Sequence, residues 1–193
     1  MSFFGGAPCA SAQRFSFGVV GGVSLTNDFG NEVFGIYYQT IIPTLYYSTS
    51  KDPIVGPMVE LRLPLHLSVE VDGLYRPLNY TSAEVLPDGS LNGVSPATVV
   101  TWEFPVLAKY KFSARRVKPF AELGPSFRTA GNLNSAAPSN YGGTIGAGVE
   151  ARLRKLRIAP AVRYTRWAPD HFQFGQPPRS FLNQAEFVVG FSF

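Results

Sequence analysis

The 193-residue sequence is poor in charge and nearly free of cysteine and histidine. Charged residues make up 16% of the chain, against about a quarter in ordinary soluble domains. A single cysteine, Cys9, excludes an internal disulfide framework and a cysteine-rich metal site. The two histidines lie far apart at His66 and His171, so neither has a second histidine nearby to share a metal ion. We therefore expect neither a cofactor nor a metal.

The sequence also lacks a long apolar run. No segment approaches the roughly 18 consecutive apolar residues that a membrane-spanning helix needs. Yet aromatic residues reach 14%, with 16 Phe and 9 Tyr, and the 19 Gly and 16 Pro are typical of a chain with many turns. A hydrophobic, aromatic chain without apolar helices must carry its hydrophobicity in strands, as transmembrane barrels do.

The net charge of +4 is modest and comes from no dense basic patch. Basic residues gather only between Arg152 and Arg157 and at Arg115 and Arg116. We therefore expect no nucleic-acid partner.

Eight segments show the strict alternation of apolar and polar residues that predicts half-buried β-strands. The clearest has Trp102, Phe104 and Val106 on one face and Glu103 and Lys109 on the other. The expected strands are 14–24, 55–63, 65–77, 99–112, 117–128, 141–154, 156–166 and 183–193. Each is close to the roughly 9–11 residues that a tilted membrane strand requires, and bacterial barrels have an even strand number.

The connections between these segments alternate between long and short. Long ones are expected at 25–54, 78–98, 129–140 and 167–182, and short ones at Pro64, 113–116 and Lys155. Outer-membrane barrels have this asymmetry, with short periplasmic turns and long extracellular loops. The pattern predicts an all-β fold, a closed antiparallel transmembrane β-barrel of eight strands. Ten strands are an alternative, because the first long segment, with Tyr37, Tyr38, Tyr46 and Tyr47, could add a hairpin.

The apolar faces of the strands are expected to meet lipid, because they carry almost no charge and have aromatic residues near the strand ends. The opposite faces carry both signs of charge, which could pair inside the barrel. This predicted lumen network comprises Glu60, Arg62, Glu70, Asp72, Arg76, Glu103, Lys109, Lys111, Glu122, Arg128, Glu150, Arg152, Arg163 and Glu186. A soluble barrel of the opposite orientation is the alternative, but it does not account for the sorted loops.

Four segments resemble the outer-membrane β-barrel domain family, the small barrels similar to outer-membrane protein A. They are 102–112, 118–128, 162–167 and the terminal strand 184–193, and the resemblance spans most of 13–193. It implies residence in the outer membrane of a Gram-negative-type bacterium, surrounded by lipid and lipopolysaccharide. It also implies that Phe187, Val189, Phe191 and Phe193 present a signal to the barrel-assembly machinery. The same residues are equally expected as the lipid face of the last strand.

The first twelve residues stand apart from the single barrel domain at 13–193. Ala10-Ser11-Ala12 has the A-x-A form of a signal-peptidase site, so 1–12 is either the end of a signal peptide or a disordered arm.

One pattern suggests chemistry. His66 and Ser68 share a strand face with Glu70, and a base beside a hydroxyl could support acyl transfer. The pattern is similar to the His-x-Ser of outer-membrane lipid A deacylases. The alternation, however, turns all three residues inward, which favours membership of an interior polar network.

Three functions are consistent with the sequence. The first is a non-enzymatic outer-membrane barrel with a plugged or narrow lumen, in a structural, adhesive or porin-like role. The second is a small-solute pore, and the third is a lipid A-modifying hydrolase that uses His66 and Ser68. The first is favoured, since many long inward side chains fill an eight-stranded barrel.

Overall fold

The computed structural model describes residues 15–35, 43–48, 51–112, 116–130, 138–169 and 180–193. These residues form eleven β-strands: β1 (Phe15–Ser24), β2 (Glu32–Gly35), β3 (Pro43–Ser48), β4 (Pro53–Arg62), β5 (Leu67–Asp72), β6 (Leu74–Val85), β7 (Leu91–Lys111), β8 (Val117–Ala130), β9 (Tyr141–Leu153), β10 (Leu156–Trp167) and β11 (Asn183–Ser192). Within these ranges there is no helix that could cross a membrane.

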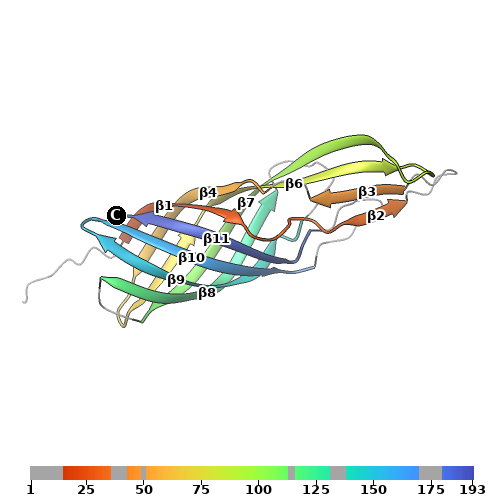
Figure 1. The fold of residues 1–193 in the computed structure, drawn as a ribbon. Coiled ribbons are helices and arrows are strands. Elements are labelled where there is room, and N and C mark those ends of the chain that lie inside the picture. The colour runs from red at the N-terminus through yellow and green to blue at the C-terminus, as the bar shows by residue number, and fades with distance from the viewer. Residues whose placement is uncertain (1–14, 36–42, 49–50, 113–115, 131–137, 170–179) are drawn as a thin grey trace, which may run out of the picture.

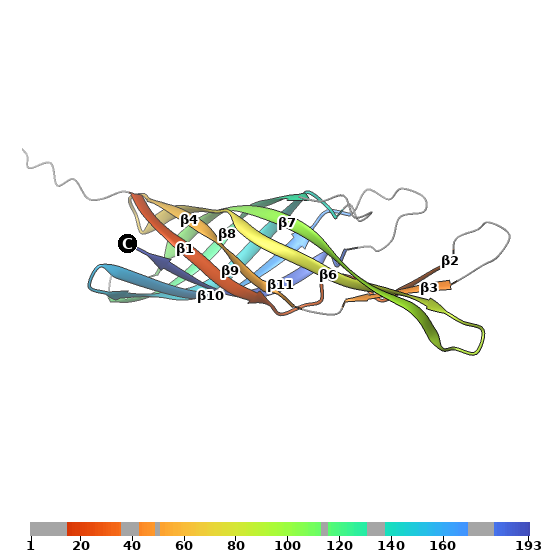
Figure 2. The ribbon, with the colours of Figure 1, turned by 90° about the horizontal axis from the view of Figure 1, so that it is seen from above.

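The sheet closes on itself into an antiparallel barrel (Figure 1; Figure 2). β1 pairs with β11 on one side, as in Val19↔Phe191, and with β4 on the other, as in Val19↔Pro57. β5 and β6 act as one wall strand, because the register with β7 is the same on both sides of Gly73. The wall therefore has eight strand positions, as the alternation predicts. Closure pairs the backbone groups of each wall strand on both sides, which hydrocarbon requires.

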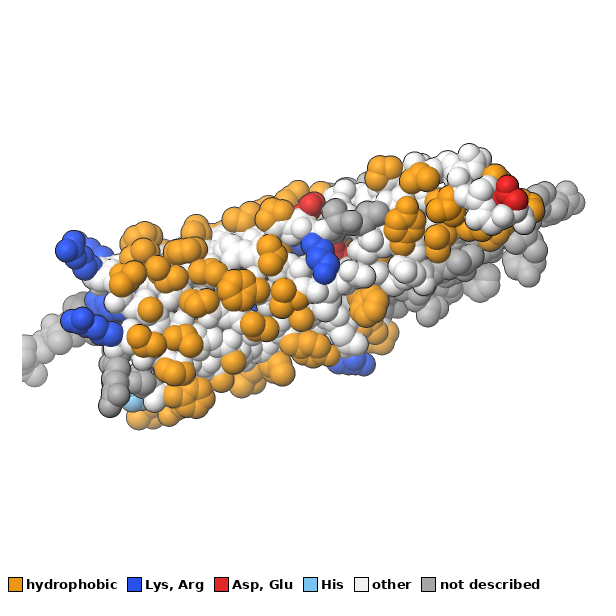
Figure 3. All heavy atoms as spheres, in the orientation of Figure 1, with side chains coloured by type: hydrophobic (Ala, Val, Ile, Leu, Met, Phe, Trp, Pro, Cys, Tyr) orange, Lys and Arg blue, Asp and Glu red, His pale blue; other side chains and the backbone are white. Residues whose placement is uncertain are grey.

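The apolar faces of the strands point outward. On β7, Trp102 and Phe104 are 40% and 39% exposed, whereas Glu103 and Lys109 are 5% and 3% exposed. Hydrophobic side chains cover the barrel surface seen in Figure 3. The predicted orientation is therefore confirmed, and the soluble alternative with Trp102 and Phe104 at the centre is excluded.

Aromatic residues pair across the outer surface. The rings of Tyr75 and Trp102 meet edge to face at 5.6 Å, and those of Tyr110 and Phe112 at 5.2 Å. Tyr164 keeps its ring outside and donates its hydroxyl to Asn183 Oδ1 at 2.8 Å. Amphipathic rings of this kind suit the boundary between hydrocarbon and water.

The turn between β4 and β5 differs from the sequence prediction. The third strand is expected to start at residue 65, but Leu65 and His66 adopt φ angles of 61° and 64° and form the turn itself. The backbone N–H of Leu67 donates to the carbonyl of Pro64, and that of Leu63 to the carbonyl of Leu67. His66 is therefore exposed, and the prediction that it points into the barrel is wrong.

The predicted loop at 78–98 is also wrong, because most of it is strand. β6 and β7 continue together to a turn at Leu86–Ser90. There the Asp88 carboxylate accepts hydrogen bonds from the Ser90 hydroxyl and N–H, which lower its pKa. Turn residues such as Pro87 and Gly89 mark this reversal in the sequence. The strands on either side of it are too polar to show the apolar–polar alternation by which the other strands are predicted.

β2 and β3 form a hairpin that pairs with the outer part of β6, as in Thr44↔Glu84. Figure 2 shows β2, β3 and the ends of β6 and β7 projecting beyond the barrel. The first long segment thus does contain two strands, but they extend the sheet outward and leave the wall at eight. Residues 1–12, Tyr37, Tyr38 and His171 lie outside the described residues.

We expect a charge on the outer face to weaken the fold. Val162 is 51% exposed on β10, next to Arg163 at the middle of the barrel. Val162→Arg should lower the free energy of unfolding by about 2–4 kcal/mol in lipid vesicles, because the guanidinium would enter hydrocarbon. Urea unfolding measures this, with Val162→Leu as the control. Equal stability of the two variants would contradict a lipid-facing exterior.

Candidate functional site

The lumen is the candidate site, because the inward side chains of all the wall strands meet there. At the end with short turns, Lys111 Nζ lies 2.6 Å from both Glu60 Oε1 and Glu150 Oε2. Arg157 Nη1 lies 3.1 Å from Glu60 Oε2. These four buried groups join β4, β7, β9 and β10 across the barrel.

Arg163 is the hub of the central layer. Its three guanidinium nitrogens each lie 2.7 Å from a different carboxylate, those of Glu70, Asp72 and Glu122. Lys109 Nζ also contacts Glu70, at 2.5 Å, and Glu122, at 3.3 Å. A guanidinium with five fixed donors suits such branching. Burial of these charges is tolerable only because each has a partner.

A third layer lies toward the projecting strands. Arg76 contacts Asp28 at 3.2 Å, Glu186 at 3.3 Å and Glu103 at 3.6 Å. Asp28 comes from the segment after β1, outside the barrel strands. Burial raises the pKa of its carboxyl, although the positive charge of Arg76 opposes the shift.

Arg128 completes this layer. It lies 2.9 Å from Glu103 Oε1, donates to Gln184 Oε1 at 2.6 Å and stacks 3.8 Å from the Trp167 ring. Trp167 Nε1 donates to the same Gln184 oxygen at 2.7 Å. The indole thus satisfies its own N–H while covering a buried guanidinium.

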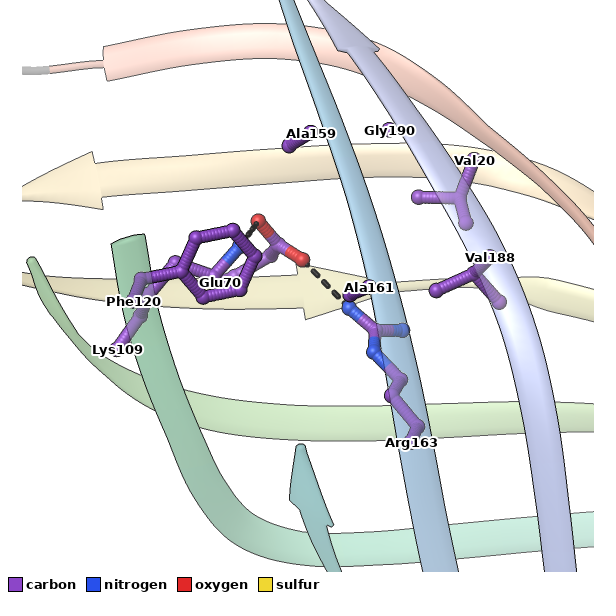
Figure 4. Close-up of a pocket in the computed structure, with 9 residues that line it drawn as sticks. All are labelled: Val20, Glu70, Lys109, Phe120, Ala159, Ala161, Arg163, Val188 and Gly190. Carbon is purple, nitrogen blue, oxygen red and sulfur yellow. Dashed lines mark hydrogen bonds and ion pairs between the residues drawn. The ribbon is translucent and has the colours of Figure 1, made fainter. Parts of the chain in front are cut away.

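Apolar side chains fill the space beside the central ion pairs. They form one buried cluster of Val20, Ile54, Met58, Leu74, Phe120, Ala161 and Val188. Lys109 Nζ lies 4.4 Å from the Phe120 ring centre. Figure 4 shows Glu70 bonded to both Lys109 and Arg163 beside this cluster. The cavity between them measures only about 10 Å³, room for about one water molecule.

Two glycines on β9 make room for this packing. A Cβ at Gly146 would come 2.7 Å from Glu122 Oε1 and 3.1 Å from Arg163 Cγ. At Gly148 it would come 2.6 Å from the Phe120 ring. The alternation of glycine along this strand therefore reflects a crowded interior.

The structure brings together most of the residues that the sequence places in the lumen network. Buried inside are Glu60, Glu70, Asp72, Arg76, Glu103, Lys109, Lys111, Glu122, Arg128, Glu150, Arg163 and Glu186. Arg62 is half-buried at the end of β4. Arg152 is exposed, contrary to expectation, because it lies at the mouth of the barrel beside the β9–β10 turn, where its Nε donates to the Arg154 carbonyl.

Sequence reasoning missed four contributors. The alternation places Arg157 on the polar face opposite Ile158, but the residue also ends the basic run at 152–157 and is not part of the predicted network. Trp167 and Asp28 fall within expected loops, and Gln184 is left out of a network defined by charged residues. A polar residue at every second position identifies Gln184, whereas nothing in the sequence around Asp28 indicates that it folds over the lumen.

The residues of the possible acyl-transfer site are split by the turn. Ser68 is buried at the start of β5, and His66 is exposed in the turn. Phe187, Val189, Phe191 and Phe193 lie on the outward side of the last strand and at its end, and their proposed role in assembly stays a prediction. Within the described ranges, no group of three His, Cys, Asp or Glu residues is arranged to hold a metal ion.

The fold is similar to that of known outer-membrane proteins. The crystal structure of outer membrane protein OprG from Pseudomonas aeruginosa aligns with a TM-score of 0.58 and 13% identity, covering 92% of this chain and 93% of that one. The solid-state NMR structure of outer membrane protein AlkL in DMPC lipid bilayers aligns with a TM-score of 0.55 and 13% identity, covering 100% and 96%. No protein-family model and no curated protein matches the sequence. The chain therefore has the fold of an outer-membrane β-barrel.

Removal of the central guanidinium should destabilise the barrel strongly. Arg163→Met leaves Glu70, Asp72 and Glu122 buried together with only Lys109 to offset them. We expect a loss of about 3–5 kcal/mol in the free energy of unfolding, measured with urea in lipid vesicles. Exposed Arg166→Met is the matched control, with an expected change below about 0.5 kcal/mol. Similar losses in both variants would rule out a special role for the buried network.

The two faces of β9 should respond differently to one added methyl group. Gly146→Ala should cost about 1–3 kcal/mol, because the methyl group displaces the Glu122–Arg163 pair. Gly143→Ala, whose added Cβ meets nothing within 4 Å, should be neutral or stabilising by up to about 1 kcal/mol. Unfolding midpoints of the two variants compare them directly. A Gly146→Ala protein as stable as Gly143→Ala would show that the interior is loosely packed.

Proposed function

We propose that this protein is a non-enzymatic barrel of the outer membrane of a Gram-negative-type bacterium, with a closed lumen and a structural or adhesive role. The observation that carries the proposal is the filling of the lumen. Three ionic layers follow one another along the lumen, an apolar cluster lies beside the central layer, and the cavity between them has room for about one water molecule.

Closure is favoured energetically as well as sterically. Arg163 and Lys109 together engage three carboxylates from two wall strands, β5 and β8, so a solute could pass only by breaking several buried ion pairs at once. Each broken pair would leave a charge in a poorly hydrated space, which costs several kcal/mol. A resting pore would instead need a hydrated path lined by solvated charges.

The projecting strands supply the surface for an adhesive role. The outer parts of β6 and β7, together with β2 and β3, stand beyond the barrel at the end opposite the short turns (Figure 1). Near the tip, Leu91 and Val94 are 46% and 56% exposed. Apolar residues held on paired strands outside the lipid belt are suited to contact another macromolecule.

A conductance measurement separates this proposal from a small-solute pore. Purified protein inserted into planar lipid bilayers should give no single-channel steps. Heat-modifiable migration on a gel verifies that the inserted protein is folded. A Met58→Ala/Phe120→Ala variant, which empties part of the apolar cluster, tests whether the assay detects an opened lumen. Regular channels from the unmodified protein would overturn the closed-lumen proposal.

A further inference from the structure

The barrel mouth at the end with short turns contains a positively charged cavity that the closed lumen does not use. The cavity measures about 220 Å³. Five cationic side chains and one carboxylate line it: Arg62, Lys111, Lys118, Arg152, Arg157 and Glu150. Figure 3 shows Lys and Arg gathered at this end of the molecule.

The cationic groups outnumber the carboxylates that reach them. Glu60 and Glu150 are both engaged by Lys111, and Glu60 also pairs with Arg157. Lys118 reaches Glu150 only at 3.9 Å. Among the described residues, no carboxylate lies within 4.0 Å of Arg62 or Arg152. The mouth therefore carries more positive charge than Glu60 and Glu150 balance.

Two guanidinium groups converge on one hydroxyl at the inner wall of this cavity. Arg62 Nη2 donates to Ser16 Oγ at 2.8 Å, and Arg157 Nη2 donates to the same oxygen. Arg157 also donates to the main-chain oxygen of Phe193 at 3.3 Å. Arg62 Nε is buried and has no hydrogen-bond partner in the described part of the chain. An anion between these two like charges would reduce their repulsion and could accept a hydrogen bond from the unused Arg62 donor.

We propose that this cavity binds a phosphate group. A phosphate offers several acceptor oxygens around one centre, which matches donors arriving from Arg62, Arg152 and Lys118 on different strands. The cavity is several times the roughly 30 Å³ that a water molecule occupies, so a phosphate ester fits as well as the free ion.

The surroundings of the cavity indicate how a lipid could supply that phosphate. Leu63 and Leu67 belong to the cavity wall, and Leu65 at the tip of the adjoining turn is 81% exposed. Acyl chains could cover these leucines while a headgroup phosphate entered the mouth. A soluble phosphate would use the cationic groups alone, so the two sources differ in their dependence on Leu65.

The test compares two double variants with the same change in net charge. Arg62→Gln/Arg152→Gln removes the two unpaired cations of the cavity. Arg154→Gln/Lys155→Gln removes two exposed cations from the neighbouring β9–β10 turn, outside the cavity. Full-length proteins in a neutral detergent are titrated with inorganic phosphate by calorimetry. Native mass spectrometry then measures retention of phosphatidylglycerol against phosphatidylcholine.

We expect the unmodified protein and the turn variant to bind phosphate equally, and the cavity variant to bind at least about tenfold more weakly. Preferential retention of phosphatidylglycerol that is lost in Leu65→Ser would identify a lipid as the source. Binding of inorganic phosphate without lipid preference would identify the free ion.

Several results would overturn the proposal. Equal weakening in both double variants would mean that only general surface charge attracts the anion. If neither phosphate nor phosphatidylglycerol bound, the phosphate site would be excluded. Binding of isolated peptidoglycan to this end of the barrel would not rescue the proposal. Heat-modifiable migration checks folding, and if Arg62→Gln/Arg152→Gln does not fold, Lys118→Gln/Arg152→Gln takes its place, since Glu150 keeps its contact with Lys111.

Discussion

Hydrocarbon offers no hydrogen-bond partner, and that constraint shapes every level of this structure. Backbone groups must pair between strands, so the sheet has to close, as β1 does by pairing with both β4 and β11. Once the sheet is closed, strand geometry sends alternate side chains inward and outward. Trp102 and Phe104 can then face lipid only if Glu103 and Pro105 face the lumen. The low overall charge of the sequence and the strict alternation of its strands therefore both follow from the hydrocarbon around the barrel.

The inward charges in turn determine what the lumen can be. An eight-stranded wall encloses little more space than its own side chains occupy. Charges confined there must neutralise one another, and Arg163 does so by reaching Glu70 and Asp72 on β5 and Glu122 on β8. Gly146 and Gly148 lack side chains where this network and Phe120 need room. Ion pairing and close packing therefore act together to fill the barrel.

The wall could be predicted from sequence because its rule is local: each residue's face depends only on its parity along the strand. Predictions were wrong where that rule stops. Leu65 and His66 continue the alternation in sequence, yet their left-handed backbone makes the turn. The strand pairs between Tyr80 and Pro96 project beyond the barrel and are rich in polar residues, so strict apolar–polar alternation does not reveal them. Asp28 enters the lumen through a chain reversal that only tertiary structure defines.

The balance of positive and negative charge differs from one level of the lumen to another. The central and outer layers each hold two cations against three carboxylates, whereas the mouth at the short turns holds five cations near two carboxylates. The positive and negative side chains therefore do not cancel within any one of these layers. In the closed interior an imbalance is limited by the cost of burying an unpaired charge. At an open mouth, water and dissolved or lipid-borne anions can complete the balance. The surplus cations consequently lie at a level of the lumen where a partner can arrive from outside.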